Sequence, residues 1–409
     1  MSSPAIAIPQ QPAGKLVVPP LWQKLPIALA GGGALLGLFG IFTMPKQFAY
    51  SYLLAFMFFL SLCLGGMFLT IIHHLFDASW SVPVRRITEH LAFLLPVMAV
   101  LFIPIAIFAP TEIYAWMKND PHVDHALHAK QPIFTKGGFY AIAVGLFAIW
   151  TWLSYNLRKW SLRQDEAGKD NALRVLCTQK LRVHSAYGIY VFALTLTLGA
   201  IMWMKALEHQ WFSTMYGVYY FAASVWTTLA TLYVIAVVLK KTGPLAAVVK
   251  ARQIHDIGVL WLAFTVFYAY IHFSQYFLIW NANIPEETFY YVKREAGSWW
   301  QICMLLVFGH FVLPFVSLLR IDAKLNLSLM IPLAVWAWGM HFCDMSFNIM
   351  PLIHQGGFVV HWLDVACMAF IGGVLALVFI KYFNAHKPYP VNDPRLGEAL
   401  GVHQHDSHE

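Results

Sequence analysis

Charged residues are scarce in this sequence. Asp, Glu, Lys and Arg together make up 11% of its 409 residues, while 59% are hydrophobic. An ordinary soluble domain carries about 25% charged residues. A soluble monomer with this composition would have to expose larger apolar patches than monomers tolerate, which excludes the water-soluble class. Because a lipid bilayer accommodates helices of about 20 apolar residues each, the composition predicts an integral membrane protein.

Cysteine is the second scarce residue. The chain has five cysteines and no C-x-x-C pair: Cys63, Cys177, Cys303, Cys343 and Cys367. The motifs for c-type haem attachment, for a four-cysteine iron–sulfur cluster and for a disulfide framework are therefore missing. We expect no covalently bound cofactor and no metal site on this chain. The formal charge of +7 is spread over short basic clusters between apolar runs, so we also expect no nucleic-acid partner.

Apolar runs long enough to cross a bilayer recur about ten times. They are residues 25–44, 50–76, 89–109, 137–157, 184–204, 215–239, 256–280, 299–319, 325–345 and 357–383. The predicted fold class is therefore all-α, an integral membrane protein with about ten transmembrane helices. We expect a transmembrane domain at 25–383, an N-terminal tail at 1–24 and a C-terminal tail at 384–409.

Lysine and arginine counts predict the orientation, because cytoplasmic connections carry an excess of these residues. With the N-terminus in the cytoplasm, 20 of the 27 Lys and Arg residues fall on the inner side and 7 on the outer side. We therefore expect both tails to be cytoplasmic. Residues 1–24 lack the apolar core of a cleavable signal peptide, so the first span is expected to be an uncleaved signal anchor. The two longest outer connections, 110–136 and 281–298, are the expected docking surfaces for extramembrane partners.

Ionisable side chains at membrane depth need a reason, because each costs about 2.5–3.5 kcal/mol on insertion scales. Polar residues also line one helical face of the sixth run, from Tyr216 to Thr231, and one face of the seventh, from Trp261 to Gln275. The candidates for a proton path fall in three layers. The outer layer is His272, His341, Asp344, His361 and Asp364; the middle layer is His310, Tyr268, Thr265 and Thr227; the inner layer is His73, Glu89, His90, His184 and Asp256.

Three interpretations of these layers compete. One is proton conduction, because His and carboxylates are the usual material of intramembrane relays. Another is b-type haem ligation by His pairs at equal depth on facing helices. The third is interhelical hydrogen bonding, which stabilises a bundle by about 0.6 kcal/mol per contact. For the outer layer taken together, we favour proton conduction over haem ligation.

Four segments resemble the ActF-type membrane subunit of alternative complex III, a bacterial quinol-oxidising assembly. They are 51–77 (SYLLAFMFFLSLCLGGMFLTIIHHLFD), 184–200 (HSAYGIYVFALTLTLGA), 204–220 (MKALEHQWFSTMYGVYY) and 255–287, which contains AYIHFSQYFLIWNANIPEE. The similarity extends over nearly all ten runs. The ActC subunit and the NrfD/polysulfide-reductase membrane family resemble this chain only in helix layout.

The resemblance implies two four-helix bundles, formed by spans two to five and six to nine, with the first and last helices peripheral. It implies a complex of the bacterial inner membrane that oxidises menaquinol or ubiquinol. The partners would be an ActC-like membrane subunit, a periplasmic Fe–S subunit, c-type cytochromes, lipids and a terminal oxidase, with the Fe–S clusters and haem c bound by those partners. Electrons would reach cytochrome c or the terminal oxidase through them.

In that family the better supported quinol site belongs to ActC. No quinol-binding motif matches this sequence position by position, so the resemblance assigns no catalytic residue here. It implies a non-metal subunit that contributes proton half-channels and partner docking rather than a stand-alone catalyst. Two alternatives stay open. A secondary transporter would bind its substrate at the bundle interface, but the sequence lacks a matched pair of short, Gly/Pro-broken spans. A purely structural scaffold would not need the polar faces of the sixth and seventh runs.

Overall fold

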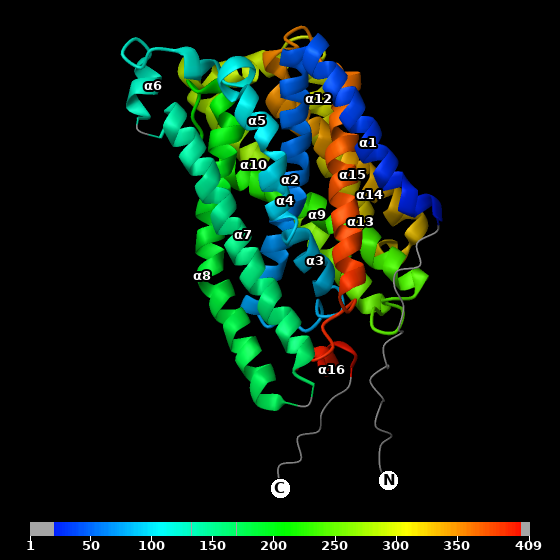
Figure 1. Cartoon of the computed structure of the whole chain (residues 1–409). Coiled ribbons are helices and arrows are strands. Elements are labelled where there is room, and N and C mark those ends of the chain that lie inside the picture. Colours follow the sequence, from blue (N-terminus) through cyan, green and yellow to red (C-terminus); the bar gives the residue numbers. More distant parts are fainter. Residues whose placement is uncertain (1–19, 132, 169, 402–409) are drawn as a thin grey trace, which may run out of the picture.

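The computed structural model describes residues 20–401 except 132 and 169. The ends of the two predicted tails, 1–19 and 402–409, lie outside the described residues. Within the described part, all regular secondary structure is helical, and nine helices are long and apolar enough to cross a bilayer. The helix α14 (Leu327–Ile349) makes a tenth crossing of the molecule. The predicted all-α integral membrane fold of about ten spans is therefore confirmed (Figure 1).

Eight spans are continuous helices: α1 (Pro20–Thr43), α2 (Pro45–Leu75), α7 (Lys136–Glu166), α8 (Asn171–Trp203), α9 (Tyr216–Thr242), α10 (Ala251–Ala282), α14 and α15 (Trp362–Ala385). Two are interrupted. The third span consists of α3 (Arg85–Ala92), α4 (Leu95–Leu101), α5 (Ile103–Phe108) and the π-helical turn η1 (Ala109–Ile113). The eighth consists of α12 (Trp299–Leu305), the π-helical segment η4 (Leu306–Val312) and α13 (Leu313–Leu319). Short helices fill the connections: η2 (Ala115–Lys118), α6 (His125–Ala129), η3 (Lys205–Glu208), α11 (Pro285–Glu295), η5 (Asp322–Leu325), η6 (Met350–Leu352) and α16 (Leu396–Ala399).

Prolines mark both interrupted spans. Pro96 and Pro104 lie in the first turns of α4 and α5, and Pro314 lies in the first turn of α13. Because proline has no N–H to donate, it is tolerated in the first turn of a helix but breaks the hydrogen-bond ladder inside one. The π-helical segment η4 carries His310, and such segments are frequent at functional sites. The sequence therefore encodes both breaks locally.

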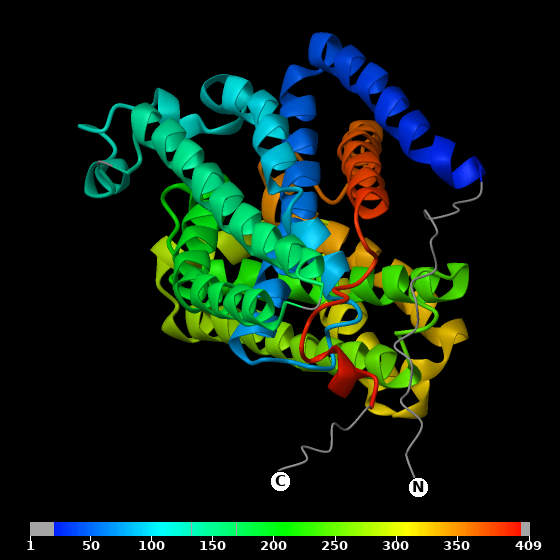
Figure 2. The same ribbon diagram turned by 60° about the horizontal axis from the view of Figure 1, so that its bottom comes forward.

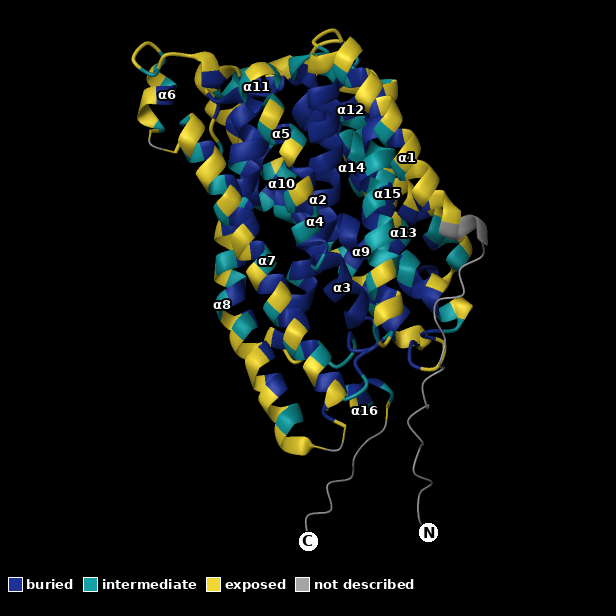
Figure 3. Cartoon of the chain, in the orientation of Figure 1, coloured by how far each residue is buried: buried dark blue, intermediate teal, exposed yellow. Residues whose placement is uncertain are grey.

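Two four-helix bundles meet along α2 and α9. In the first bundle α2 packs against α3 and α8, and α7 packs against α8 and α4; in the second, α9 packs against α10 and α14, and α10 packs against α13. The helices α2 and α9 also pack against each other and are the most deeply buried spans (Figure 3). Gly65 of α2 permits this close approach, because a Cβ at that position would lie 2.1 Å from Oγ1 of Thr228 on α9.

The first and last spans lie outside both bundles. The helices α1 and α15 pack along each other, and α15 packs on α2. The outer side of α1 is exposed, and its exposed residues include Leu35 and Phe42 (Figures 2 and 3). Large apolar side chains on such a face are expected of a helix that contacts lipid. The predicted bundle arrangement with peripheral first and last helices is confirmed.

The connections gather at two ends of the molecule, named here the upper end and the lower end after their places in Figure 1. The lower end holds the connections 76–84, 167–170, 243–250 and 320–326, and the upper end holds 114–135, 204–215, 283–298 and 350–361. Residues 386–401, from the predicted C-terminal tail, fold across the lower end and finish in α16 (Figure 2). Arg395 pairs with Asp77 at 2.9 Å, and Gln253 donates to the Ala399 carbonyl at 3.0 Å.

Candidate functional site

Asp344 lies in a buried polar chain of the second bundle. Its side chain is fully buried on α14, and its carboxyl group accepts a hydrogen bond from the Tyr219 hydroxyl of α9. One turn further along α14, Nδ2 of Asn348 donates to the Tyr219 oxygen at 2.8 Å and to the Asp344 carbonyl at 2.8 Å. Because an unpartnered carboxyl group is costly in an apolar interior, these contacts explain how the span accommodates Asp344.

From Asn348 the hydrogen bonds continue toward the upper end. Its Oδ1 accepts from the hydroxyl groups of Tyr216 and Tyr290 at 3.0 and 2.9 Å. The ring of Tyr290 stacks on Trp211 with centroids 3.8 Å apart. The amide of Asn348 therefore joins three tyrosines, two from α9 and one from α11, and one of them, Tyr219, donates to Asp344.

Arg294 of α11 connects this group to the surface. Its guanidinium group, which is buried, donates to the Asn348 carbonyl at 3.0 Å and to Glu208 at 2.9 Å. Glu208 also accepts from Lys293 at 2.9 Å, and the Lys293 side chain is 50% exposed. A continuous series of polar contacts thus joins Asp344 to the upper surface.

Aromatic and histidine rings pack beside Asp344. The His310 ring lies between Trp226 and Tyr268, with centroids 3.8 Å from each. The His272 ring lies 5.7 Å from Tyr268 and 5.5 Å from Tyr219. Both ring nitrogens of His310 lack a hydrogen-bond partner among the described residues. His310 is therefore held by stacking, and its two ring nitrogens are buried without a hydrogen-bond partner among those residues.

His341 belongs to the same region at mid-depth. Its Nε2 lies 2.8 Å from Oγ of Ser61, a residue near the middle of α2, and its ring packs on Phe58 with centroids 4.8 Å apart. Of the five predicted outer residues, the structure therefore gathers three, His272, His341 and Asp344, around the contact between α2, α9, α10 and α14.

The other two outer residues lie elsewhere. His361 and Asp364 form the N-terminal cap of α15: the His361 ring accepts from the backbone N–H of Leu363, and Asp364 accepts from the His361 N–H at 2.8 Å. Asp364 also accepts from Ser51 of α2 at 2.5 Å. Ser51 and Ser61 are ten residues apart on one helix, or roughly 15 Å along its axis. The predicted single cluster is thus divided into a group of three and a capping pair.

The two predicted threonines bond mainly to their own helices. Thr227 donates to the Ala223 carbonyl at 3.0 Å, and Thr265 donates to the Trp261 carbonyl at 2.8 Å. Such back-bonding satisfies a hydroxyl group inside a span without any partner helix. Thr265 in addition accepts from the Trp226 indole at 2.9 Å. In the middle layer, Tyr268 and His310 therefore contact the Asp344 group, and the threonines support the helices.

A buried ionic cluster occupies the lower end of the first bundle. Glu89 accepts from Arg85 at 2.9 Å, from Arg86 at 2.7 Å and from Ser161 at 2.7 Å. His73 lies 2.9 Å from Arg85 through its Nε2 and 2.5 Å from Ser81 through its Nδ1. Two of the five predicted inner residues, His73 and Glu89, thus share one network.

Sequence reasoning missed the other members of this cluster. Arg85 also pairs with Asp393 of the C-terminal segment, and Arg86 pairs with Asp165 of α7. Both arginine side chains are 0% exposed, although their position at the end of an apolar run is typical of a solvated topology signal. The sequence does contain one hint, since Glu89 follows the two arginines at helical spacings of four and three.

The remaining inner residues are separate from the cluster. His90 is buried among Phe379, Phe383 and His386. His184 pairs with Tyr187 on the same helix. Asp256 is partly exposed and lies 3.9 Å from Arg252. The predicted inner layer is therefore four sites rather than one.

The two long upper connections lie side by side. A cavity of about 1110 Å³ is lined by Asp124 and Lys130 of the first connection and by Glu286 and Phe289 of α11. His209 donates to Asp124 at 2.6 Å. Partial burial acts to raise the pKa of Asp124, but the hydrogen bonds from His209 and other groups together outweigh this effect and lower the pKa below its usual range. The sequence predicted these connections as docking surfaces, and the structure brings them to one face.

In the described part of the chain no group of three or more His, Cys, Asp or Glu side chains is placed to hold a metal ion. A scan against models of protein families finds no match to this chain, and a search of curated proteins finds none either.

Proposed function

We propose that this chain is an ActF-type membrane subunit of a bacterial quinol-oxidising respiratory complex, alternative complex III. In this proposal the complex oxidises menaquinol or ubiquinol, and electrons pass through periplasmic Fe–S and c-type cytochrome subunits to cytochrome c or a terminal oxidase. The chain itself contributes proton half-channels and docks its partners through the upper end. The segments that resemble ActF support the family, and the polar chain at Asp344 supports the role.

The observation that carries the proposal is the connection from Asp344 through Tyr219 and Asn348 to the upper surface. Arginine and asparagine cannot exchange protons at physiological pH, so Arg294 and Asn348 act as anchors. The exchangeable groups are the Asp344 carboxyl, the tyrosine hydroxyls and the His272 ring. Hydrogen bonding that only stabilised the bundle would need neither a surface connection nor a histidine with two free nitrogens.

The orientation belongs to the same proposal. We place the lower end in the cytoplasm, with the hairpin of α7 and α8 extending beyond the body of the molecule on that side (Figure 1). Seven Lys and Arg residues lie between Arg158 and Arg182. Even without the buried and paired Arg85 and Arg86, the lower side keeps more than twice as many Lys and Arg residues as the upper side, so the positive-inside rule still applies.

Purification through a tag on this chain tests the assembly. We expect an ActC-like membrane subunit, an Fe–S protein and a multihaem cytochrome to co-purify, because the proposal assigns all redox metals to those partners. A chain that purifies alone and supports uptake of a solute in vesicles would replace the proposal with a transporter.

The variant Asp344→Asn tests the proton path in the purified complex. An amide keeps the size of the side chain and can still accept from Tyr219, but it has no exchangeable carboxyl proton. We expect unchanged haem content and a lower proton-to-electron ratio in reconstituted vesicles. Asp364→Asn is the matched control, because Asp364 caps α15 outside this group, and its ratio should equal that of the wild type. An unchanged ratio and turnover in Asp344→Asn would leave the group with a structural role only.

A further inference from the structure

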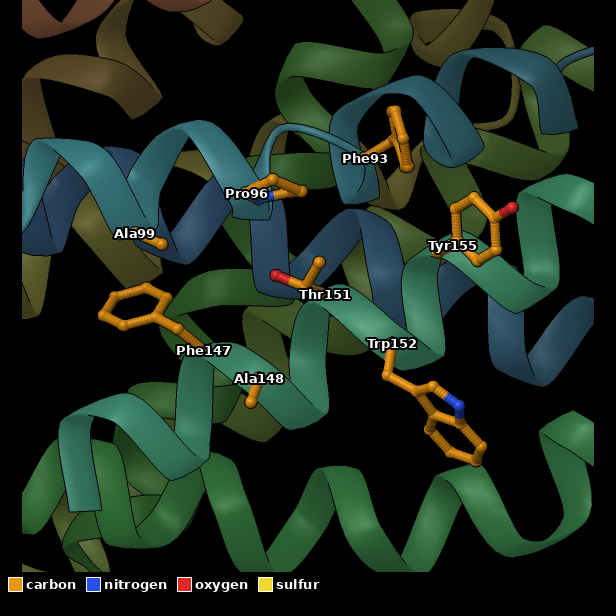
Figure 4. Close-up of a pocket in the computed structure, with 8 residues that line it drawn as sticks. All are labelled: Phe93, Pro96, Ala99, Phe147, Ala148, Thr151, Trp152 and Tyr155. Atoms are coloured by element: carbon orange, nitrogen blue, oxygen red, sulfur yellow. The ribbon is translucent and has the colours of Figure 1, made fainter. Parts of the chain in front are cut away.

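A groove runs along the outside of the first bundle between α4 and α7. It has a volume of about 430 Å³, and its lining includes Phe93, Pro96, Ala99, Phe147, Ala148 and Trp152. Figure 4 shows Pro96 and Ala99 on the broken third span and Phe147, Ala148 and Thr151 on α7 across from them. The helix α3 ends at Ala92 and α4 begins at Leu95 with Pro96 in its first turn, so the break in the third span lies beside the groove. The groove is lined mainly by apolar side chains and opens on the outer surface of the first bundle.

The groove continues toward the lower end into a basic mouth. A second cavity of about 470 Å³ shares Phe93 and Tyr155 with the first. Its remaining lining is Arg158, Lys159, Leu162, Arg163, Glu166 and His386. The two cavities therefore form one continuous depression with apolar side chains along most of its length. Its mouth has three cationic side chains, Arg158, Lys159 and Arg163, and one carboxylate, Glu166. A lipid with an acyl chain and an anionic headgroup has the same arrangement of chemistry.

Arg158 makes the mouth a built site rather than a basic surface. The residue is only 6% exposed, and its guanidinium group lies 4.1 Å from the Phe93 ring centroid and 4.5 Å from that of Tyr382. No hydrogen bond or ion pair to another described residue involves its side chain, and its buried Nε has no partner. The buried Arg85 and Arg294, in contrast, are each paired with a carboxylate. The two rings offset part of the cost of this buried charge, but no carboxylate of the described chain pairs with it. Because a buried charge without an anionic partner is costly, the site favours an anion from outside the chain.

We propose that this groove binds one anionic phospholipid, with an acyl chain along Pro96, Ala99 and Ala148 and the phosphate at Arg158. The planar guanidinium fork matches two phosphate oxygens, and Lys159 and Arg163 add positive charge at the mouth. In the proposed orientation the mouth faces the anionic cytoplasmic leaflet. A quinol would fit the apolar part, but its neutral head would leave Arg158 without an anion. The proposal does not depend on the respiratory role of the chain.

Native mass spectrometry of the detergent-purified assembly tests the site by titration with phosphatidylglycerol and with phosphatidylcholine. We expect one tightly retained phosphatidylglycerol and weaker phosphatidylcholine binding. Arg158→Gln should weaken the retained phosphatidylglycerol at least tenfold, since it removes charge-assisted hydrogen bonds. Ala148→Phe fills the apolar part from an exposed position and should displace both lipids. Lys180→Gln removes an exposed charge of α8 away from the groove and should change neither.

Several outcomes would overturn the proposal. They are equal retention of the two lipids by the wild type, unchanged phosphatidylglycerol binding in Arg158→Gln, and release of a quinol instead of a phospholipid on solvent extraction. If Arg158→Gln fails to fold, Arg163→Gln together with Ala148→Phe keeps the test, because both residues are exposed. Lipid binding that neither variant affects would equally refute the site.

Discussion

The substitution Asp393→Asn is the sharpest test of how the C-terminal segment is held. Asp393 and Arg85 are both 0% exposed at their side chains and are paired, and Asp393 also accepts from Nε and Nη2 of Arg395 at 3.0 Å each. Removing one partner of a buried pair costs about 3–5 kcal/mol, because the other charge stays buried. Arg85 keeps Glu89 at 2.9 Å, which limits the loss. We therefore expect the lower value, about 3 kcal/mol.

This loss should appear as local opening of residues 386–401 rather than as unfolding of the bundle, since a surface segment opens before the core does. A change of about 3 kcal/mol corresponds to a factor of roughly 100 in the opening equilibrium. Hydrogen exchange of the amides in α16 measures this factor directly. Exchange in α2 and α9 should stay unchanged, because those helices do not depend on the segment for their packing.

Glu398→Gln is the matched control, because it makes the same charge change in the same segment at an exposed side chain that only accepts from Ser79. Its exchange should match the wild type within a factor of about two, as expected of exposed sites. Equal acceleration in both variants, or none in Asp393→Asn, would refute the view that the buried pair holds the segment.

The pH dependence follows from the same contacts. Burial alone would raise the pKa of Asp393, but the charge of Arg85 and the contacts of Arg395 outweigh it, so the pKa lies well below its usual range. An unfolded Asp titrates near 3.9. The stabilisation by this carboxylate is therefore complete above about pH 5 and is lost only as the pH falls through the lower folded value. Protection of α16 should thus not change through this group between about pH 6 and 8.

Two further predictions concern other buried positions. Burial, helped by the nearby Lys130, lowers the pKa of Lys205 to about 7, while an unfolded lysine titrates near 10.4. The stability of the fold should therefore rise with pH between these two values. Lys205→Met should flatten that rise in melting temperatures measured across this pH range, and equal slopes for the variant and the wild type would count against it. Gly65→Ala should destabilise the contact of α2 and α9 by about 1–3 kcal/mol through overpacking. Gly339→Ala is the control, because a Cβ there meets nothing within 4 Å, and it should be neutral or slightly stabilising. Similar melting temperatures for the two variants would contradict the steric reason.

The spans were predictable because each depends on a local property, the length of an apolar run. Even the breaks at Pro96 and Pro104 can be read from the chain, since proline acts on its own helix. The peripheral place of α1 and α15 was predicted only from the resemblance to a family. Helix packing depends on which helix faces fit together, and the apolar residues of different spans are too similar for the sequence alone to show this.

The sites were less predictable because their partners are distant in the chain. The sequence placed His341 and Asp344 in one layer, but Tyr219 and Arg294, which help to complete the chain to the surface, come from α9 and α11. Asn348 lies only four residues after Asp344 on α14, and sequence reasoning nevertheless missed it. Arg85 and Arg86 look like solvated topology signals, and only the fold brings Asp165 and Asp393 to them from positions far along the sequence. His361 and Asp364 have the same spacing as His341 and Asp344, yet they cap a helix. Spacing within a helix therefore identifies a shared face but not what that face meets.

The two polar groups lie at different depths, on either side of an apolar stretch of α2. Ser61, the contact of His341, and His73, the contact of Arg85, are twelve residues apart on α2, or roughly 18 Å along its axis. Between them, from Leu62 to Leu69, α2 carries no charged or hydroxyl side chain, and every one of these residues except Phe68 is buried. A continuous polar path would let protons flow down the membrane gradient without work. Two half-paths that no charged or hydroxyl side chain of α2 connects would avoid this leak. The stretch of α2 at Gly65 and Met67, which meets the Thr228 hydroxyl of α9 at Gly65, is therefore as necessary to the proposed role as the polar groups on either side.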